Sequence, residues 1–104
     1  MGLGIDIVYI PRIKDADTLA RGVLTPRELE LYSKRTKKEE FLAGRFAAKE
    51  AFMKALEQGL KLPFKDIEVL YKDSGAPYIL YKNKQYEVSI SHDGDYAIAI
   101  VNFK

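Results

Sequence analysis

The segment 41–54 constrains the fold of this chain more than any other part of the sequence, because it mixes apolar faces with charges. Its apolar residues recur at helical spacing and its alanines favour a helix. Four charged side chains stand among them: Arg45, Lys49, Glu50 and Lys54. Charges are almost never fully buried unless they are paired or used. A core helix that carries a carboxylate with cations one turn away suits a metal ion and phosphate groups, so the function is sought here.

Composition excludes several classes of protein. The 104 residues are enough for one domain, expected to span 1–104, and 47% of them are hydrophobic, as in a folded globular protein. The sequence has no cysteine, which excludes disulfides, thiolate metal sites and a cysteine nucleophile. No apolar run is long enough to span a bilayer and no signal-peptide layout opens the chain, so we expect a cytoplasmic protein that does not bind membranes.

The charge distribution leaves one question open. A net charge of +2 argues against a dedicated nucleic-acid binder, and no nucleic-acid partner is expected. The cations are nevertheless distributed unevenly along the chain, with a basic run formed by Lys34, Arg35, Lys37 and Lys38. This run is either a solvated helix end or a set of phosphate contacts.

The N-terminal half predicts one strand followed by three helices. Residues 4–10 form a β-branched run that Pro11 ends, and a short helix is expected over 12–20. Thr25 is predicted to cap the next helix, with Pro26 at its first position and Glu28 completing a capping box, and this helix runs to about Lys34. The third helix is expected to cover Lys38 to Gln58 and to stop at Gly59.

The C-terminal half changes to the period of strands. Segments 73–77 and 82–84 have turn composition, and short turns join antiparallel neighbours. The predicted strands are 66–72, 77–81, 85–91 and 96–103. A strand, three helices and then an antiparallel meander indicate an α+β fold with the helices packed on one face of the sheet.

Two carboxylates are unusual for their positions. Asp6 lies in the middle of a strand, where Asp is rare, and Glu50 lies in the alanine-rich helix. Taken singly, Asp6 could be a buried carboxylate bonded to a loop or an arginine, and Glu50 could form a surface pair with Lys54. Taken together, they resemble the two oxygen ligands by which proteins usually hold Mg²⁺ with water and phosphate.

The helix geometry divides the cations into two stripes. Lys54 follows Glu50 by one turn, and Arg45 and Lys49 share the neighbouring stripe. Cations beside a Mg²⁺ site are what a polyphosphate requires.

The only histidine, His92, ends a strand next to Ser91. A single histidine is most often structural, but a Ser-His pair at a strand end can also donate hydrogen bonds to a phosphate. The pair does not indicate a hydrolase, because adjacent strand residues face opposite sides. The segment from Gly75 to Pro77 is, by itself, a hairpin turn.

These motifs together resemble the holo-[acyl-carrier-protein] synthase family, the short bacterial-type 4′-phosphopantetheinyl transferases. The resemblance runs in order along nearly the whole chain. Its most specific part is Arg45-Phe-Ala-Ala-Lys-Glu-Ala51, and the other parts are Gly4-Ile-Asp-Ile-Val8, Arg12-Ile13, Gly75-x-Pro77 and Ser89-Ile-Ser-His92.

The resemblance implies an enzyme that binds Mg²⁺ and moves the 4′-phosphopantetheine arm of coenzyme A (CoA) onto a serine of apo acyl carrier protein. Adenosine 3′,5′-bisphosphate is then the leaving group. Asp6 and Glu50 would bind the metal and Lys54 the pyrophosphate, and the general base is left open between the two carboxylates and a water on the metal. The remaining CoA contacts would be Arg45, Lys49, Gly75, Pro77, Ser91 and His92.

The resemblance also implies partners. Arg12, and with it Lys14 and Arg21, would face the acidic carrier protein, although the same segment carries Asp15 and Asp17. Family members of this size form trimers with active sites between subunits. Tyrosines 78, 81, 86 and 96, with the alternating apolar residues of the late strands, are expected to cover the open sheet face by meeting another copy.

Two other functions remain as alternatives. One is a non-catalytic module that holds CoA or a nucleotide, or that docks an acidic protein. The other is an RNA-binding domain that uses the basic run and the tyrosines, which the net charge disfavours. The two carboxylates favour the enzyme, since a mere binder needs cations but no pair of metal ligands.

Overall fold

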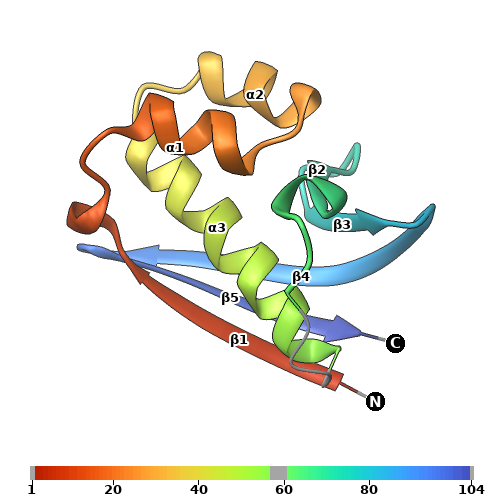
Figure 1. The fold of residues 1–104 in the computed structure, drawn as a ribbon. Helices are drawn as coiled ribbons and strands as arrows, with labels where there is room; N and C mark the ends of the chain where they lie inside the picture. Colours follow the sequence, from red (N-terminus) through yellow and green to blue (C-terminus); the bar gives the residue numbers. More distant parts are fainter. Residues whose placement is uncertain (1, 57–60, 104) are drawn as a thin grey trace.

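A single antiparallel sheet with helices on one face makes up the fold (Figure 1). The computed structural model describes residues 2–56 and 61–103. The five strands have the order β1-β5-β4-β3-β2, so the first strand of the chain pairs with the last. The prediction of an α+β fold with a strand, three helices and a strand meander is confirmed.

The elements follow in the order that the sequence predicts. The helices are α1, Ala16–Val23, α2, Pro26–Ser33, and α3, Lys38–Ala55. The strands are β1, Gly2–Tyr9, β2, Glu68–Tyr71, β3, Pro77–Tyr81, β4, Lys84–Asp93, and β5, Tyr96–Phe103. Short 3₁₀ turns cover Ile10–Arg12 and Phe64–Asp66.

The predicted bounds of the first helix, 12–20, are wrong, because α1 spans Ala16–Val23. Its N-cap is Asp15, whose carboxylate accepts hydrogen bonds from the backbone N–H of Thr18 at 3.2 Å and from its hydroxyl at 2.8 Å. Residues before this cap form a 3₁₀ turn instead, as proline permits. A capping aspartate satisfies an orphan N–H at a helix start, and this capping sets the start of α1 after Asp15.

The second helix begins as predicted. Thr25 N–H donates to Glu28 Oε1 at 2.9 Å, and Glu28 N–H donates to Thr25 Oγ1 at 3.3 Å, which completes the capping box. The predicted end of the third helix, at Gln58 and Gly59, lies outside the described residues, and within them α3 ends at Ala55. None of the described helices is long and apolar enough to cross a membrane.

Three strands differ from their predicted bounds, and β1 runs over Gly2–Tyr9 instead of over 4–10. β2 begins at Glu68 instead of residue 66, because Phe64–Asp66 closes a 3₁₀ turn in which Ile67 N–H donates to Phe64 O. β4 extends beyond Ser91, since His92 and Asp93 still pair with β5.

The core is centred on α3, which lies against β1 and β5 (Figure 1). A Cβ atom built on Gly4 would lie 1.8 Å from Ala51 O, and one built on Gly2 would lie 1.6 Å from Ala55 O. Only glycine therefore permits the strand and helix backbones to approach so closely. This contact fixes where α3 sits above β1.

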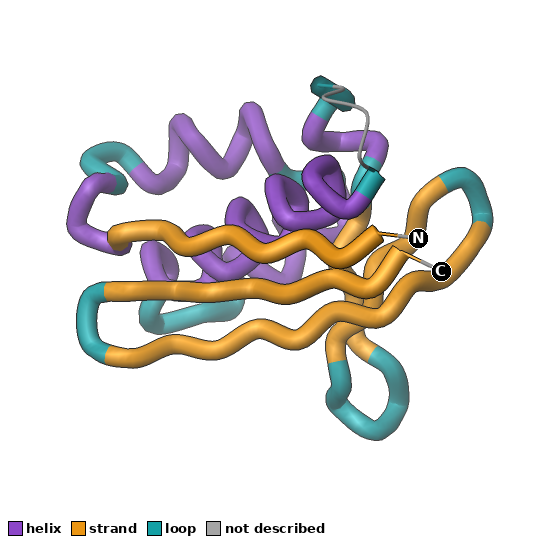
Figure 2. Tube along the Cα trace, turned by 90° about the horizontal axis from the view of Figure 1, so that it is seen from below, coloured by secondary structure: helices purple, strands orange, loops and turns teal. Residues whose placement is uncertain are grey.

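The opposite face of the sheet is open and apolar, and Figure 2 looks onto it. Side chains that alternate with the core-facing ones line up across β1 and β5, where Ile5 pairs with Ile100 and Ile7 with Ile98. The exposed set consists of Leu3, Ile5, Ile7, Tyr9, Tyr96, Ile98 and Ile100. A contiguous apolar surface of this kind is typical of a contact with another molecule.

The tyrosine prediction is partly wrong. Tyr96 does lie on the open face, where its ring packs at a tilt against that of Tyr9 with centroids 5.3 Å apart. Tyr81 and Tyr86 instead pack against the core, where both meet the edge of Phe52. Their register on β3 and β4 places them on the helix side of the sheet, because Tyr86 pairs with the buried Ile79 and Tyr81 follows Ile79 by two residues.

Replacing Gly4 with alanine tests the backbone contact. We expect Gly4→Ala to lower the free energy of unfolding by at least about 3 kcal/mol, the upper end of overpacking costs, because the new methyl meets a backbone carbonyl that cannot rotate away. Urea unfolding measures the change. Gly22→Ala is the matched control: nothing lies within 4 Å of its Cβ position, so it should stabilise the exposed part of α1 slightly. Equal stability of the two variants would contradict the close contact.

Candidate functional site

Asp6 and Glu50 line the same cavity, as the sequence predicts for a pair of metal ligands. Asp6 projects from β1 toward the helix side, and Glu50 comes from the middle of α3. The cavity has a volume of about 480 Å³, and Phe46, Arg12 and Lys14 also line it. We call it the carboxylate cavity.

Lys54 lies at the same site but not with the expected partner. Its ammonium donates to Asp6 Oδ1 at 3.1 Å and to Ile5 O at 3.0 Å. The alternatives of a Glu50–Lys54 surface pair and an arginine partner for Asp6 are therefore replaced by a Lys54–Asp6 ion pair. The ammonium is half exposed and so remains accessible to a ligand in the cavity.

The donor set fits a hard cation that is shared with a phosphate. The described residues contain no cluster of three or more His, Cys, Asp or Glu side chains that could enclose a metal. Two carboxylates with an open cavity beside them leave most of the coordination shell to other oxygen atoms, which is how Mg²⁺ is commonly bound. The Lys54 ammonium already places one positive charge beside Asp6.

Of the three cations predicted to face a carrier protein, Arg12 and Lys14 border the carboxylate cavity, and both are exposed. Arg21 lies on α1, where it donates to Thr18 Oγ1 at 3.3 Å, and it is not part of this lining in the described structure. The nearby acidic residues have structural roles, since Asp15 caps α1 and Asp17 accepts from the Tyr32 hydroxyl at 2.7 Å.

A second cavity of about 340 Å³ lies on the other side of α3, between this helix, β4 and the loop after α2. We call it the arginine cavity. Its lining brings together Arg45, His92 and Pro77, which the sequence groups as nucleotide contacts. It also includes Arg35, Lys37, Phe41 and Tyr71.

Arg45 is held in this cavity by two aromatic rings. Its Cζ atom lies 4.0 Å from the centroid of Phe41 and 4.8 Å from that of Tyr71. The side chain is 3% exposed, and Nε is the one buried side-chain nitrogen or oxygen among the described residues without a hydrogen-bond partner. Burial lowers the pKa of the guanidinium from its ordinary value, and the neighbouring Tyr71 opposes this shift. A buried cation with an unused donor is suited to an anionic ligand.

The basic run divides into different roles. Arg35 donates to the Tyr71 hydroxyl at 2.8 Å and stacks over Phe41, which places it in the arginine cavity. Lys38 instead donates to the backbone carbonyls of Ser33 and Arg35, and Lys34 forms an exposed pair with Glu30. Sequence reasoning left this run undecided because the role of Arg35 depends on its contact with Tyr71 of β2, which is distant in the sequence.

His92 is oriented by the backbone of α3. Its Nε2 lies 3.1 Å from Glu40 O, and since a carbonyl can only accept, Nε2 carries the proton. Gly44 makes this approach possible, because a Cβ there would lie 3.1 Å from His92 Nε2 and from Ile90 Cγ2. Sequence reasoning missed Gly44, and a glycine inside an alanine-rich helix was the available signal.

Two predicted CoA contacts are not brought to this cavity. Ser91 pairs with Ile98, so it lies on the open face of the sheet, opposite to His92. Gly75, with φ of +94°, shapes the predicted turn, in which its N–H donates to Lys72 O at 2.8 Å. It does not line the arginine cavity, whereas Pro77, at the end of the same turn, does.

Lys49 is the clearest correction among the predicted site residues. Its side chain is 0% exposed and its ammonium pairs with Glu28 at 2.6 Å. The ammonium also donates to the carbonyls of Val23 and Phe64, so its three N–H groups are used inside the protein. The prediction that Lys49 binds CoA is therefore wrong, because no donor is left for a phosphate.

The two cavities lie on different sides of α3. Arg45 and Glu50 are five positions apart, which separates their directions by about 140° around the helix axis. His92 and Asp6 follow the same division, since they lie on β4 and on the edge strand β1.

Comparison with known proteins places the chain in one family. Residues 2–101 match the model of the 4′-phosphopantetheinyl transferase superfamily. The chain is 47% identical over 107 residues to a holo-[acyl-carrier-protein] synthase of Enterococcus faecalis, an alignment that covers 94% of this chain and 92% of the relative.

Solved structures agree with the sequence match. A holo-(acyl-carrier-protein) synthase of Bacillus anthracis in complex with CoA (3′,5′-ADP) superimposes with a TM-score of 0.85 at 39% identity, over 96% of this chain and 92% of that one. A Helicobacter pylori holo-[acyl-carrier-protein] synthase in complex with coenzyme A gives a TM-score of 0.83 at 35% identity, over 96% and 97%.

Replacing Gly44 with alanine tests how His92 is held. We expect Gly44→Ala to displace the imidazole and to break its hydrogen bond to Glu40 O, because the new methyl meets the ring at 3.1 Å. His92 is the only histidine, so its ring signals in NMR spectra are unambiguous, and its Nε2–H should exchange with solvent at least about tenfold faster once the bond is lost. Gly22→Ala should leave these signals in place. Unchanged ring signals in Gly44→Ala would contradict the geometry.

Proposed function

Because the chain belongs to the 4′-phosphopantetheinyl transferase superfamily, as the sequence predicts, we propose that it transfers the 4′-phosphopantetheine arm of CoA to a serine of apo acyl carrier protein. Adenosine 3′,5′-bisphosphate is the other product. The observation that carries this proposal is the convergence of Asp6 and Glu50 on one cavity, with the Lys54 ammonium beside Asp6.

The carboxylate cavity is the proposed reaction site. Asp6 and Glu50 would hold Mg²⁺, which would neutralise charge on the pyrophosphate of CoA. Lys54 stabilises the negative charge that develops on the leaving bisphosphate. The serine oxygen forms a bond to the β-phosphorus, the bond from that phosphorus to the bridging oxygen breaks, and a carboxylate of the cavity or a bound water takes the serine proton.

The arginine cavity is the proposed nucleotide site. Arg45 and Arg35 supply positive charge, and Phe41 and Tyr71 supply ring faces, a combination suited to the 3′-phosphate and base of the adenosine part. His92 adds a nitrogen at the same edge, and Pro77 closes it.

The separation of the two cavities by α3 favours an assembly in which one CoA molecule contacts two copies of the chain. Within one chain, α3 stands between Arg45 and Glu50, so a CoA molecule that contacts both would have to pass around the helix. Two copies solve this problem if the arginine cavity of one lies next to the carboxylate cavity of another. The exposed apolar face over β1 and β5 supplies a surface for that contact. We infer a homotrimer with CoA bound across each interface.

The remaining assignments follow from the same family. Arg12 and Lys14, at the mouth of the carboxylate cavity, are placed to attract the acidic carrier protein, with Arg21 further along α1. We propose that the chain acts as one domain in the cytoplasm, where carrier proteins are modified.

Removing either carboxylate tests the reaction site. We expect Asp6→Asn and Glu50→Gln to lower kcat by on the order of a hundredfold or more, the loss seen when one group that stabilises transition-state charge is removed. Mass spectrometry of apo acyl carrier protein, incubated with the variant, CoA and Mg²⁺, measures the transfer.

Glu39→Gln is the control, since Glu39 is an exposed carboxylate on the same helix and should be dispensable. Near-native turnover of Asp6→Asn or Glu50→Gln at saturating Mg²⁺ would show that the two-carboxylate site is wrong. Absence of transfer by the native chain would overturn the proposed function itself.

Mixing two inactive variants tests the shared site. Arg45→Met damages the arginine cavity and Glu50→Gln the carboxylate cavity, so each is expected to be nearly inactive alone at a CoA concentration near the native KM. After joint refolding in equal amounts, about one quarter of the interfaces of randomly assembled trimers combine two native halves. Activity should therefore recover to about that fraction.

Light scattering of the native chain should give the mass of three copies. A mixture no more active than its components, or a fully active monomer, would contradict the interfacial site.

A further inference from the structure

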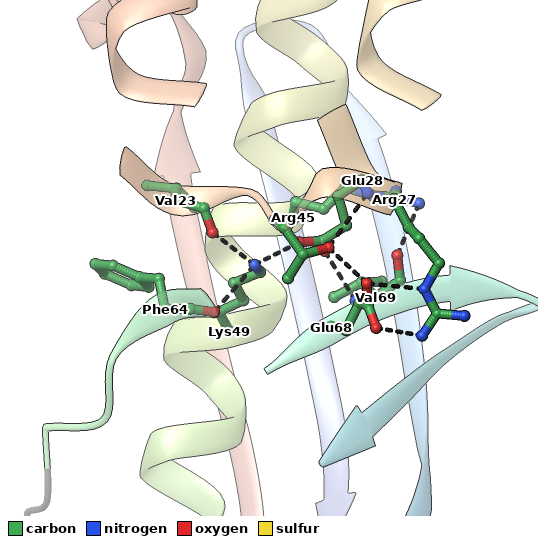
Figure 3. Close-up of polar contacts among 9 residues, drawn as sticks. Val23, Arg27, Glu28, Arg45, Lys49, Phe64, Glu68 and Val69 are labelled. Carbon is green, nitrogen blue, oxygen red and sulfur yellow. Dashed lines mark hydrogen bonds and ion pairs between the residues drawn. The ribbon is translucent and has the colours of Figure 1, made fainter. Parts of the chain in front are cut away.

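A buried ion pair joins Glu28 of α2 to Lys49 of α3, the helix that separates the two cavities (Figure 3). Both side chains are 0% exposed, and Lys49 Nζ lies 2.6 Å from Glu28 Oε1. Glu28 Oε2 accepts from the backbone N–H of Val69 at 2.8 Å. Lys49 also donates to Val23 O at 2.7 Å and Phe64 O at 3.1 Å. The pair thus joins α2, α3, β2 and the segment before β2.

The stability of the fold does not by itself explain this pair. A buried ion pair is often no more stabilising than apolar side chains of similar volume, because both charges lose their hydration. Burial indeed lowers the pKa of the Lys49 ammonium, although Glu28 opposes this shift. Unlike apolar residues, the pair forms directional hydrogen bonds, and these hold particular backbone atoms in place.

One end of the pair reaches the arginine cavity. Val69 N–H is bound by Glu28, and Val69 O accepts from Arg45 Nη2 at 3.4 Å, so both sides of this residue are tied to α2 and α3. Two residues later on the same strand, Tyr71 forms one of the rings that enclose Arg45. A displacement of β2 would therefore open the stack around the guanidinium.

The other end reaches the carboxylate cavity. The carbonyl of Phe64 accepts from Lys49, and the Phe64 ring packs on Phe46 with centroids 5.2 Å apart. Phe46 lines the cavity one turn before Glu50. Lys49 is also the residue that directly precedes Glu50 on α3.

We propose that Glu28 and Lys49 are positioning residues, which hold β2 and the Phe64 segment so that both cavities keep their shape for CoA. The proposal rests on the proposed function, because it concerns the same substrate. It assigns to Lys49 a role that needs no contact with any phosphate.

Double replacement separates positioning from folding. Lys49→Met and Glu28→Leu alone each leave a buried charge without its partner, so both should lose much stability. The double variant Lys49→Met/Glu28→Leu removes both charges, so in urea unfolding it should be more stable than either single variant, although Val69 N–H and the carbonyls of Val23 and Phe64 lose their partners. Its KM for CoA should nevertheless stay raised by about tenfold or more, because small displacements of binding groups are costly.

The exposed pair Lys34–Glu30 provides a matched control, since it has the same residue types and both side chains are 72% exposed. Lys34→Met/Glu30→Leu should change neither stability nor KM. A Lys49/Glu28 double variant with native stability and native KM would overturn the positioning role, while native transfer activity would still support the proposed function.

A milder variant covers the case in which the double variant does not fold. Glu28→Gln keeps an oxygen for Lys49 but places an amide NH₂ where Val69 N–H needs an acceptor. Calorimetry with 3′,5′-ADP, which requires no transfer, should then show binding weakened by about tenfold, with Mg²⁺ binding unchanged. Native affinity for 3′,5′-ADP in this folded variant would equally overturn the proposal.

Discussion

The close approach of α3 to β1 is the constraint on which the rest of the structure depends. Gly2 and Gly4 allow the strand backbone to touch the helix backbone at Ala55 and Ala51. Asp6 follows Gly4 by two residues on the same side of the strand, and Glu50 immediately precedes Ala51. The contact that seats the helix on the sheet therefore also brings the two carboxylates to one cavity, so packing and site geometry have a common cause.

The position of α3 on β1 also fixes what its other sides face. Arg45 faces β2 and β4, and Glu50 faces the segment after β1. Lys49 lies between these two directions and points into the protein. The helix thus separates two cavities, one on each side of it. Its alanines keep it thin enough to pack closely, and the open face of β1 and β5 gives a second copy a place to lie.

Sequence patterns predicted the local features well. The capping box of Thr25 and Glu28, the turn at Gly75 and the strand meander all depend on residues close together in the chain. The pairing of Asp6 with Glu50 in one cavity was also predicted, with the help of a family resemblance. Lys49 was misjudged, because helical spacing gives the angle between two side chains but not which angle faces the core.

Glu28 shows why the role of Lys49 could not be predicted from the sequence. Its spacing from Thr25 identifies a capping residue, and the structure confirms that role. The same carboxylate also binds Lys49, 21 residues away, and Val69, 41 residues away, and neither bond leaves a periodic trace in the sequence. A capping glutamate at a solvated helix end would have left Lys49 available for a ligand. Because Glu28 is buried, one carboxylate both caps α2 and anchors β2. The capping-box spacing in the sequence therefore gives no sign of its long-range contacts.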